Sequence, residues 1–357
     1  MSDVLSEYWL SFIIVFGLAF ATAYISTPYT IPLGFRLKMV AVPRGRRQHE
    51  GATSLAGGMA IFAAFMFAIL LAQFLPVERT DQKEVIRLAG MIIGGCFIYL
   101  VGMLDDRWEF SPLILYTAQV IAGAIAITFL IFIESFNNPL TGSTESGWPF
   151  IVTVIISIFW LGLMMNTVNW LDGADGLAAG VVGIASLMIF IHSAFELRQV
   201  SVSLLALALF GATLGFLPFN FHPAKVFMGG GALFLGYSIG VLSIIGGAKM
   251  ATILLVMGLP LTDLWWQILR RLIQGKNPAH GDRGHLHFRL VDMGISQRAI
   301  VLGYYFFCTC FGAIALITAS RLFKFIAILV MVGILIGTFA VVSLRSQKAG
   351  IIIDPHS

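Results

Sequence analysis

Long apolar segments separated by short polar stretches run through most of this 357-residue chain. A helix needs about 18 or more apolar residues to cross the roughly 30 Å of hydrocarbon in a bilayer. The segments are continuous and much longer than the alternating segments of about 10 residues that build an outer-membrane barrel, so they predict an all-α, polytopic transmembrane bundle. The eleven predicted spans, with ends defined to within a few residues, are 9–31, 56–75, 88–104, 112–133, 149–168, 176–193, 202–219, 231–247, 250–269, 299–319 and 323–343.

Composition narrows the class of protein further. The chain is 58% hydrophobic and 11% charged, so residues 1–357 are expected to form a single integral-membrane domain with a short tail at 344–357. The three cysteines lie in apolar segments and predict neither a disulfide framework nor a zinc site. No basic tract alternates with aromatic residues, so the net charge of +4 does not indicate nucleic-acid binding. No basic residue precedes the first apolar segment, which is therefore expected to be a retained span and not a signal peptide.

Lysine and arginine are distributed unevenly between the two sets of alternating connections. They number 15 in the connections after odd-numbered spans and in the C-terminal tail, against 7 on the opposite side. The positive-inside rule therefore predicts that the odd-numbered connections and the C-terminus are cytoplasmic and that the N-terminus lies outside. Residues 134–148, which fall outside by this count, contain two acids and no lysine or arginine.

Polar side chains gather in the connections predicted to be cytoplasmic, and the outer connections have no comparable cluster. Channels and transporters more often carry ionisable residues near mid-membrane, so this distribution favours an enzyme that joins a cytosolic substrate to a lipid. In the first cluster, Arg47 and His49 are candidate substrate contacts, although topology alone accounts for its basic residues. The clusters are Arg44–Glu50, Asp105–Arg107, Asn166–Asp175, Phe227–Gly231 and His280–Arg289.

Two of these clusters are rich in oxygen ligands. Asp105 and Asp106 end the third predicted span, and adjacent carboxylates repel one another unless a cation or an arginine neutralises them. They suit Mg²⁺, which binds a few carboxylates together with phosphate oxygens, although solvated helix-cap acids would look the same. The second cluster places amides and carboxylates at every third position, a pattern that suits a hard cation and sugar hydroxyls. Its members are Asn166, Asn169, Asp172 and Asp175.

The last predicted cytoplasmic connection is rich in cationic side chains. Arg283 and Arg289 could each clamp a phosphate with paired donors, and His285 with His287 could donate to phosphate oxygens or move protons. Two histidines at i and i+2 without a cysteine do not indicate zinc. The alternative is a basic loop that lies against anionic lipid head groups.

Three of these elements resemble motifs of the polyprenyl-phosphate N-acetylhexosamine-1-phosphate transferases, membrane enzymes that begin lipid-linked synthesis of bacterial peptidoglycan, teichoic acid and O-antigen. The family's Asp-Asp element resembles residues 105–106, and its Asn-x-x-Asn-x-x-Asp-Gly-x-x-Gly-Leu element resembles residues 166–177. Its late histidine motif resembles residues 285–290. The resemblance covers residues 30–300.

The resemblance implies phosphoryl transfer at the cytoplasmic face of the bacterial inner membrane. The phosphate of undecaprenyl phosphate would attack the β-phosphorus of a UDP-N-acetylhexosamine and release UMP, with Mg²⁺, or alternatively Mn²⁺, as cofactor. Phe227 would stack on the uracil base. By this resemblance the catalytic residues are Asp105, Asp106, Asp172, His285 and His287, the metal ligands are Asp106, Asn169 and Asp172, and the substrate contacts are Asn166, Asp175, Phe227, Arg283 and Arg289.

The histidine motif also indicates a branch of the family. Its form, Asp-Arg-Gly-His-Leu-His-x-Arg-Leu, looks like the branch that uses UDP-N-acetylglucosamine or a related simple sugar nucleotide. The branch that uses UDP-MurNAc-pentapeptide typically has three consecutive histidines followed by Phe-Glu. This chain has Leu286 and Arg289 at the differing positions and shares Phe288 with that second branch.

One element departs from the family pattern. The family's Phe-Met-Gly-Asp-x-Gly supplies an aspartate that ligates Mg²⁺, whereas residues 227–232 read Phe-Met-Gly-Gly-Gly-Ala, one residue short and without the acid. The alternatives are therefore a catalytically impaired homologue, a transporter of lipid or nucleotide sugar, and the phospho-MurNAc-pentapeptide transferase. The sequence leaves the oligomeric state open, a homodimer included.

Overall fold

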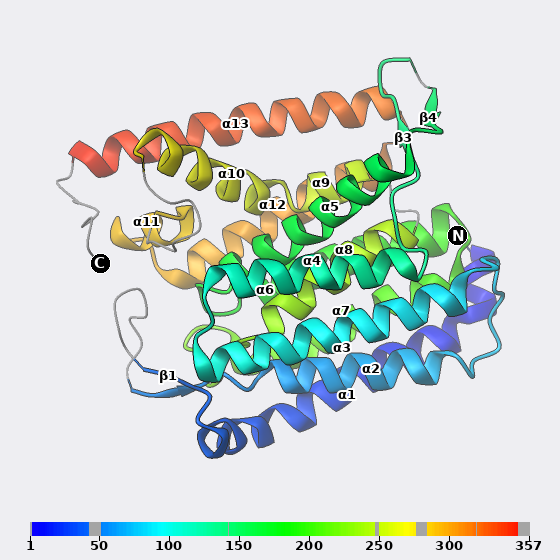
Figure 1. Ribbon diagram of the computed structural model, residues 1–357, viewed down its shortest axis with the longest axis horizontal. Coiled ribbons are helices and arrows are strands. Elements are labelled where there is room, and N and C mark those ends of the chain that lie inside the picture. The colour runs from blue at the N-terminus through cyan, green and yellow to red at the C-terminus, as the bar shows by residue number, and fades with distance from the viewer. Residues whose placement is uncertain are drawn as a thin grey trace.

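The computed structural model describes residues 2–42, 51–141, 143–246, 250–275, 284–318 and 320–348. Most of the helices run side by side as one bundle, as Figure 1 shows. The strand β1 and the short helix α11 lie at one end of the bundle, and the hairpin of β3 and β4 lies at the other. Connections that alternate along the chain are therefore separated in space.

Helices make up nearly all of the regular structure, and the strands form two small antiparallel pairs, β1 with β2 and β3 with β4. The elements in chain order are α1 (Ser2–Leu37), β1 (Val40–Ala41), β2 (Thr53–Ser54), α2 (Gly58–Ala72), α3 (Glu84–Trp108), α4 (Pro112–Thr128), β3 (Ser135–Asn137), β4 (Thr144–Ser146), α5 (Phe150–Leu171), α6 (Leu177–Ile191), the π-helical turn η1 (His192–Glu196), α7 (Val200–Asn220), α8 (Gly231–Ile245), α9 (Met250–Val256), α10 (Gly258–Ile273), α11 (Leu286–Asp292), α12 (Gln297–Ile317) and α13 (Arg321–Lys348).

Each of the eleven predicted apolar segments contains a helix in its described part, although the helix of the fourth, 112–133, ends at Thr128. Among the described residues, seven helices are long and apolar enough to cross a membrane, and an eighth span results if the bent pair α9 and α10 is one span. Three further apolar helices, α2, α4 and α8, are shorter, with 15, 17 and 15 residues. The polytopic helical fold is therefore confirmed, while the count of eleven spans stays a prediction.

The predicted ninth span, 250–269, is formed by two helices and not by one continuous helix. It breaks between α9 and α10, which meet at an angle of 77°. Pro260 lies four residues after Val256, the last residue of α9. Because proline has no amide hydrogen and its ring crowds the carbonyl four residues earlier, α9 cannot continue through this position in a straight line.

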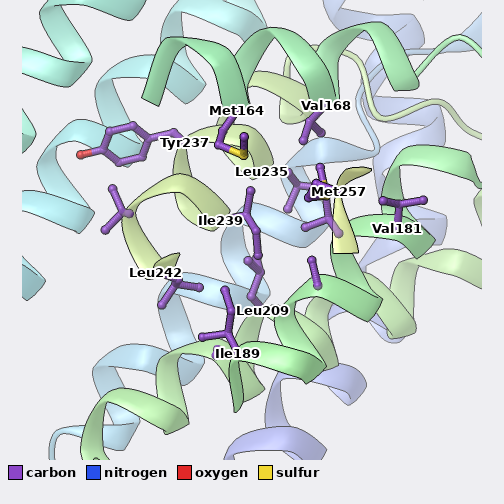
Figure 2. Close-up of a cluster of buried hydrophobic side chains, with 14 of the residues drawn as sticks. Met164, Val168, Val181, Ile189, Leu209, Leu235, Tyr237, Ile239, Leu242 and Met257 are labelled. Carbon is purple, nitrogen blue, oxygen red and sulfur yellow. The ribbon is translucent and has the colours of Figure 1, made fainter. Parts of the chain in front are cut away.

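Helix α8 lies at the centre of the bundle, and all but one of its residues are buried. Figure 2 shows Leu235, Ile239 and Leu242 of α8 among side chains of α5, α6 and α7. Tyr237 points toward α3, where its hydroxyl donates to the Gly90 carbonyl at 3.0 Å. The contact with α5 is very close, since a Cβ on Gly236 would lie 2.4 Å from the Cα of Met165. This packing fixes the N-terminus of α8, on which the site described below depends.

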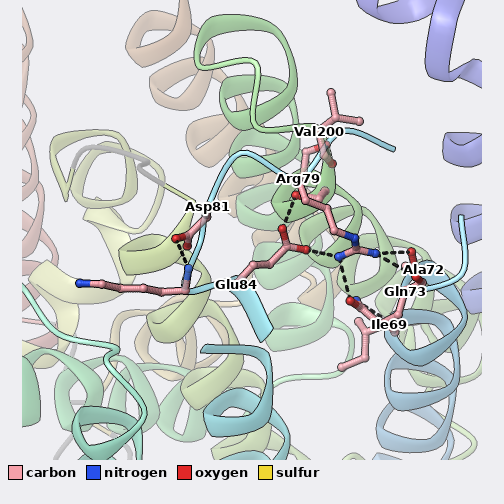
Figure 3. Close-up of polar contacts among 10 residues, drawn as sticks. Ile69, Ala72, Gln73, Arg79, Asp81, Glu84 and Val200 are labelled. Atoms are coloured by element: carbon pink, nitrogen blue, oxygen red, sulfur yellow. Dashed lines mark hydrogen bonds and ion pairs between the residues drawn. The ribbon is translucent and has the colours of Figure 1, made fainter. Parts of the chain in front are cut away.

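The end of the bundle that carries β3 and β4 also carries a polar network. Arg79 pairs with Glu84 at 2.5 Å, and Ser201 donates to the other oxygen of the Glu84 carboxylate at 2.7 Å. Arg79 also bonds the side chain and the carbonyl of Gln73, as Figure 3 shows. The network joins the end of α2 to the starts of α3 and α7, so its contacts stabilise the packing of these three helices.

Candidate functional site

The loop between α7 and α8, residues 221–230, connects two of the predicted polar clusters. Near its start, the Asp175 carboxylate oxygen Oδ2 bonds His222 Nδ1 at 2.8 Å and accepts from the Ala224 amide at 3.1 Å. At its end, the Gly230 amide donates to Asp106 Oδ2 at 2.7 Å. Asp175, which follows α5, and Asp106, near the end of α3, therefore lie at the same end of the bundle.

The turn after Asp175 is held from two sides. Gly176 has a φ of +80°, a conformation that favours glycine. Its amide donates to Asn220 Oδ1 at 3.1 Å, and its carbonyl accepts from the Tyr305 hydroxyl at 2.5 Å. Asn220 also donates to the Val226 carbonyl at 3.0 Å, which fixes the following loop. The position of Asp175 is thus set by α7 and α12 together.

The glycines at 229–231 have a steric reason. A Cβ on Gly230 would lie 2.1 Å from the carbonyl carbon of Gly102, and a Cβ on Gly231 would lie 2.6 Å from the Cα of Gly58. The backbones of α2 and α3 thus touch the start of α8 directly. An acid of the family pattern has no room at Gly230, where the backbone amide instead donates to Asp106.

The two acids at the end of α3 have different partners. Asp105 Oδ1 accepts from the Phe110 amide at 2.7 Å, so this carboxylate holds the turn that ends the helix. Asp106 accepts from the start of α8. Both side chains are partly exposed, and Arg107, the next residue, donates to the Leu37 carbonyl at 2.5 Å. The pair therefore lies at the junction of α1, α3 and α8.

The predicted site residues around the end of α5 differ in their partners and in their exposure. Asn166 donates to Gln119 Oε1 at 2.6 Å and to the Gly162 carbonyl at 2.8 Å, which ties α5 to α4. Asn169 is exposed, and Asp172 follows the last residue of the helix and is partly exposed. Of these residues, Asn166 is therefore held against α4, while Asp175 bonds the 221–230 loop.

Phe227 follows the same loop toward α8 and lies beside the β1–β2 pair. Its amide donates to the Ser54 carbonyl at 2.9 Å, and its carbonyl accepts from the Gly57 amide at 3.0 Å. The ring is partly buried and packs against the small apolar cluster of Met39, Ala41 and Leu55. The connection after α1 thus joins the same end of the bundle.

The histidine motif forms the start of α11 and is anchored by an acid that the sequence reasoning missed. Asp263 of α10 lies 3.0 Å through Oδ2 from His285 Nδ1, and its Oδ1 accepts from the Leu286 amide at 3.0 Å. Asp263 is 2% exposed and His285 is 5% exposed. A single acid within an otherwise apolar segment was the sequence signal, because such residues are costly unless they have a partner.

Aromatic contacts join this motif to the end of α5. The Trp170 ring meets His285 edge-on, with centroids 5.1 Å apart, and the guanidinium of Arg271 lies 5.4 Å from the centre of the same ring. A Cβ on Gly173 would lie 3.0 Å from His287 Nε2. The turn after Asp172 and α11 are therefore in close contact at Gly173.

Two of the predicted cationic phosphate contacts are buried. His287 and Arg289 are 1% and 4% exposed, so they are built into the packing of α11 and are not open to solvent. The predicted contacts Arg47, His49 and Arg283 lie outside the described residues. Within the described part of the chain, no three His, Cys, Asp or Glu side chains form a group that could hold a metal ion.

Removal of the buried acid gives a testable expectation for stability. Asp263→Ala leaves His285 and the Leu286 amide without their common acceptor, and we expect a loss of about 2–4 kcal/mol in the free energy of unfolding. Thermal unfolding in detergent measures this loss. Leu269→Ala, at a 54% exposed position of the same helix, is the matched control, and an equal melting temperature for both variants would contradict the anchoring role.

The fold and the site together define a polytopic helical membrane protein with acids, amides and histidines gathered at one end of its bundle. The sequence model of glycosyl transferase family 4 matches residues 88–247. The chain is 30% identical over 327 residues to the probable undecaprenyl-phosphate N-acetylglucosaminyl 1-phosphate transferase of Bacillus subtilis strain 168, covering 89% of this chain and 87% of that protein. The chain belongs to glycosyl transferase family 4.

Other relatives separate the two branches. Identity to the decaprenyl-phosphate N-acetylglucosaminephosphotransferase of Mycolicibacterium smegmatis is 31% over 325 residues, 84% of this chain and 79% of that protein. The phospho-N-acetylmuramoyl-pentapeptide-transferase of Listeria monocytogenes serotype 4b strain CLIP80459 is 32% identical over 247 residues, 64% of this chain and 74% of that protein. The similarity extends further along the N-acetylglucosamine relatives, which confirms the branch indicated by the histidine motif.

Proposed function

We propose that the protein transfers N-acetylhexosamine 1-phosphate, with N-acetylglucosamine as the sugar, from a UDP-sugar to undecaprenyl phosphate. The products are the polyprenyl-pyrophosphoryl sugar and UMP. The observation that carries this proposal is that the family's elements meet at one end of the bundle, where the 221–230 loop bonds Asp175 and Asp106. Similarity to the N-acetylglucosamine relatives over most of both chains supports the choice of sugar.

In this reaction an oxygen of the lipid phosphate forms a bond to the β-phosphorus of the UDP-sugar, and the bond from that phosphorus to the bridging oxygen breaks. Both reactants are anionic, so the protein's main tasks are to hold them in line and to offset their repulsion. The carboxylates of Asp106 and Asp172 and the amide of Asn169 suit Mg²⁺, which commonly takes one or two carboxylates plus substrate phosphates. Mg²⁺ would supply charge neutralisation at the phosphates.

The location proposed for the site is the cytoplasmic face of a bacterial inner membrane, with the N-terminus outside. Supporting this, the described parts of the connections after α1, α3, α5, α7 and α10 meet at one end. The connections after the predicted odd-numbered spans, together with the C-terminal tail, carry 15 of the 22 lysines and arginines. The hairpin of β3 and β4, which lacks both residue types, lies at the opposite end.

A transfer assay with the purified protein tests the proposed function. Radiolabelled UDP-N-acetylglucosamine and undecaprenyl phosphate should yield labelled lipid and UMP when Mg²⁺ is added, and much less after chelation. UDP-MurNAc-pentapeptide should yield no lipid product. Product from the pentapeptide substrate alone would assign the other branch, and binding of UDP-sugar without any turnover would identify an impaired homologue.

A further inference from the structure

His222 is held by one side of its ring only. Nδ1 lies 2.8 Å from Asp175 Oδ2, and the side chain of Asp175 is 18% exposed. The His222 side chain is 39% exposed, and no described residue bonds its Nε2. Asp175 therefore holds the ring through Nδ1, and Nε2 remains accessible to a ligand.

The backbone around His222 is fixed at several points. Its carbonyl accepts from Arg298 Nε at 3.0 Å, which ties it to the start of α12. Two residues earlier, Asn220 bonds both Gly176 and Val226. Two residues later, the Ala224 amide donates to the same oxygen of Asp175 that bonds the ring. The imidazole is thus positioned in advance, a condition for an efficient binding group.

The surroundings of His222 indicate what it would bind. The 221–230 loop that contains this residue ends at Gly230, which bonds Asp106, so His222 lies at the end of the bundle assigned to phosphate chemistry. A bare Asp175 carboxylate would repel a phosphate. An imidazole bonded to that carboxylate through Nδ1 instead presents Nε2, which in the protonated ring is a donor suited to a phosphate oxygen.

We propose that His222 Nε2 binds a phosphate group of one of the two substrates and that Asp175 is its positioning residue. The inference rests on the proposed function, since it assigns one more phosphate contact to the same site. It adds a positioning role for Asp175 to the uridine contact implied by the resemblance, because both printed bonds use Oδ2 only. The pair could not be predicted from the sequence, because His222 lies in a short loop without a recognisable ligand spacing.

Two matched substitutions distinguish a substrate contact of His222 from a purely structural role in the 221–230 loop. His222→Asn places an amide donor where Nδ1 bonds Asp175 and removes the group at Nε2. His222→Gln places its amide nearer to Nε2 and gives up the bond to Asp175. Steady-state kinetics would give KM separately for UDP-N-acetylglucosamine and for undecaprenyl phosphate, and thermal unfolding would monitor the fold.

We expect His222→Asn to keep the melting temperature and to raise KM for one of the two substrates by about 10-fold or more, as fits the loss of a hydrogen bond to a charged group. The substrate whose KM rises identifies the phosphate. His222→Gln should unfold at a lower temperature than His222→Asn and retain more of the affinity for that substrate. Unchanged kinetics for His222→Asn in an active preparation would overturn the inference and leave His222 with a structural role only.

Calorimetric titration with UDP keeps this inference distinct from the proposed function. If the wild-type protein forms no lipid product, the transfer proposal fails, while weaker UDP binding by His222→Asn would still support the phosphate contact. Equal UDP affinity for the wild type and His222→Asn, together with an unchanged KM for the lipid, would count against it.

Discussion

Gly230→Asp is expected to destabilise the protein and to lower its activity, although it restores the acid of the family pattern. A Cβ at this position would lie 2.1 Å from the carbonyl carbon and 2.3 Å from the carbonyl oxygen of Gly102. Both atoms belong to the backbone of α3, which cannot rotate away as a side chain can. Since milder overpacking costs about 1–3 kcal/mol, we expect a loss of roughly 3 kcal/mol or more in the free energy of unfolding.

Thermal unfolding and the transfer assay together decide this prediction. Gly230→Ala should lose much of the same stability, because the clash begins at Cβ. Gly303→Ala in α12 is the matched control, since a Cβ there meets nothing within 4 Å, and it should be neutral or slightly stabilising. A Gly230→Asp protein that melts like the wild type and turns over faster would show that the missing acid impairs the enzyme.

Asp106→Asn is expected to abolish most of the activity while the protein remains folded. The asparagine oxygen can still accept from the Gly230 amide, which Asp106 now bonds at 2.7 Å, but the negative charge available to a cation is lost. We expect a fall of about 100-fold or more in transfer rate, as is typical when a group that stabilises charge in the transition state is removed.

Asp106→Ala should lose both activity and stability. The alanine removes the acceptor at the N-terminus of α8, and such a loss costs about 1 kcal/mol. Asp81→Asn is the control, because this acid pairs with Arg87 at the opposite end of the bundle and should keep full activity. Wild-type rates in Asp106→Asn would exclude the carboxylate charge from the chemistry.

Much of the site could be predicted because polar residues in an apolar chain are conspicuous. The acids at 105–106 and 172–175 and the histidines at 285–287 stand out, and the structure brings their loops together at one end. Asp263 and His222 were missed for different reasons. Asp263 lies inside a predicted span, and its importance depends on a partner 22 residues away. His222 depends on Asp175, which lies 47 residues earlier in the chain.

The sequence by itself determined the helical membrane bundle, since span length and hydropathy are local properties that a bilayer selects directly. It also determined the family, because motif spacing survives at about 30% identity. Only the tertiary structure decided that α9 and α10 bend by 77°, that Asp263 anchors His285, and that Gly230 has no space for a side chain. Pro260 is a local reason for a break, but the angle of that bend and the other two outcomes depend on how close distant parts of the chain approach after packing, and no local pattern encodes that distance.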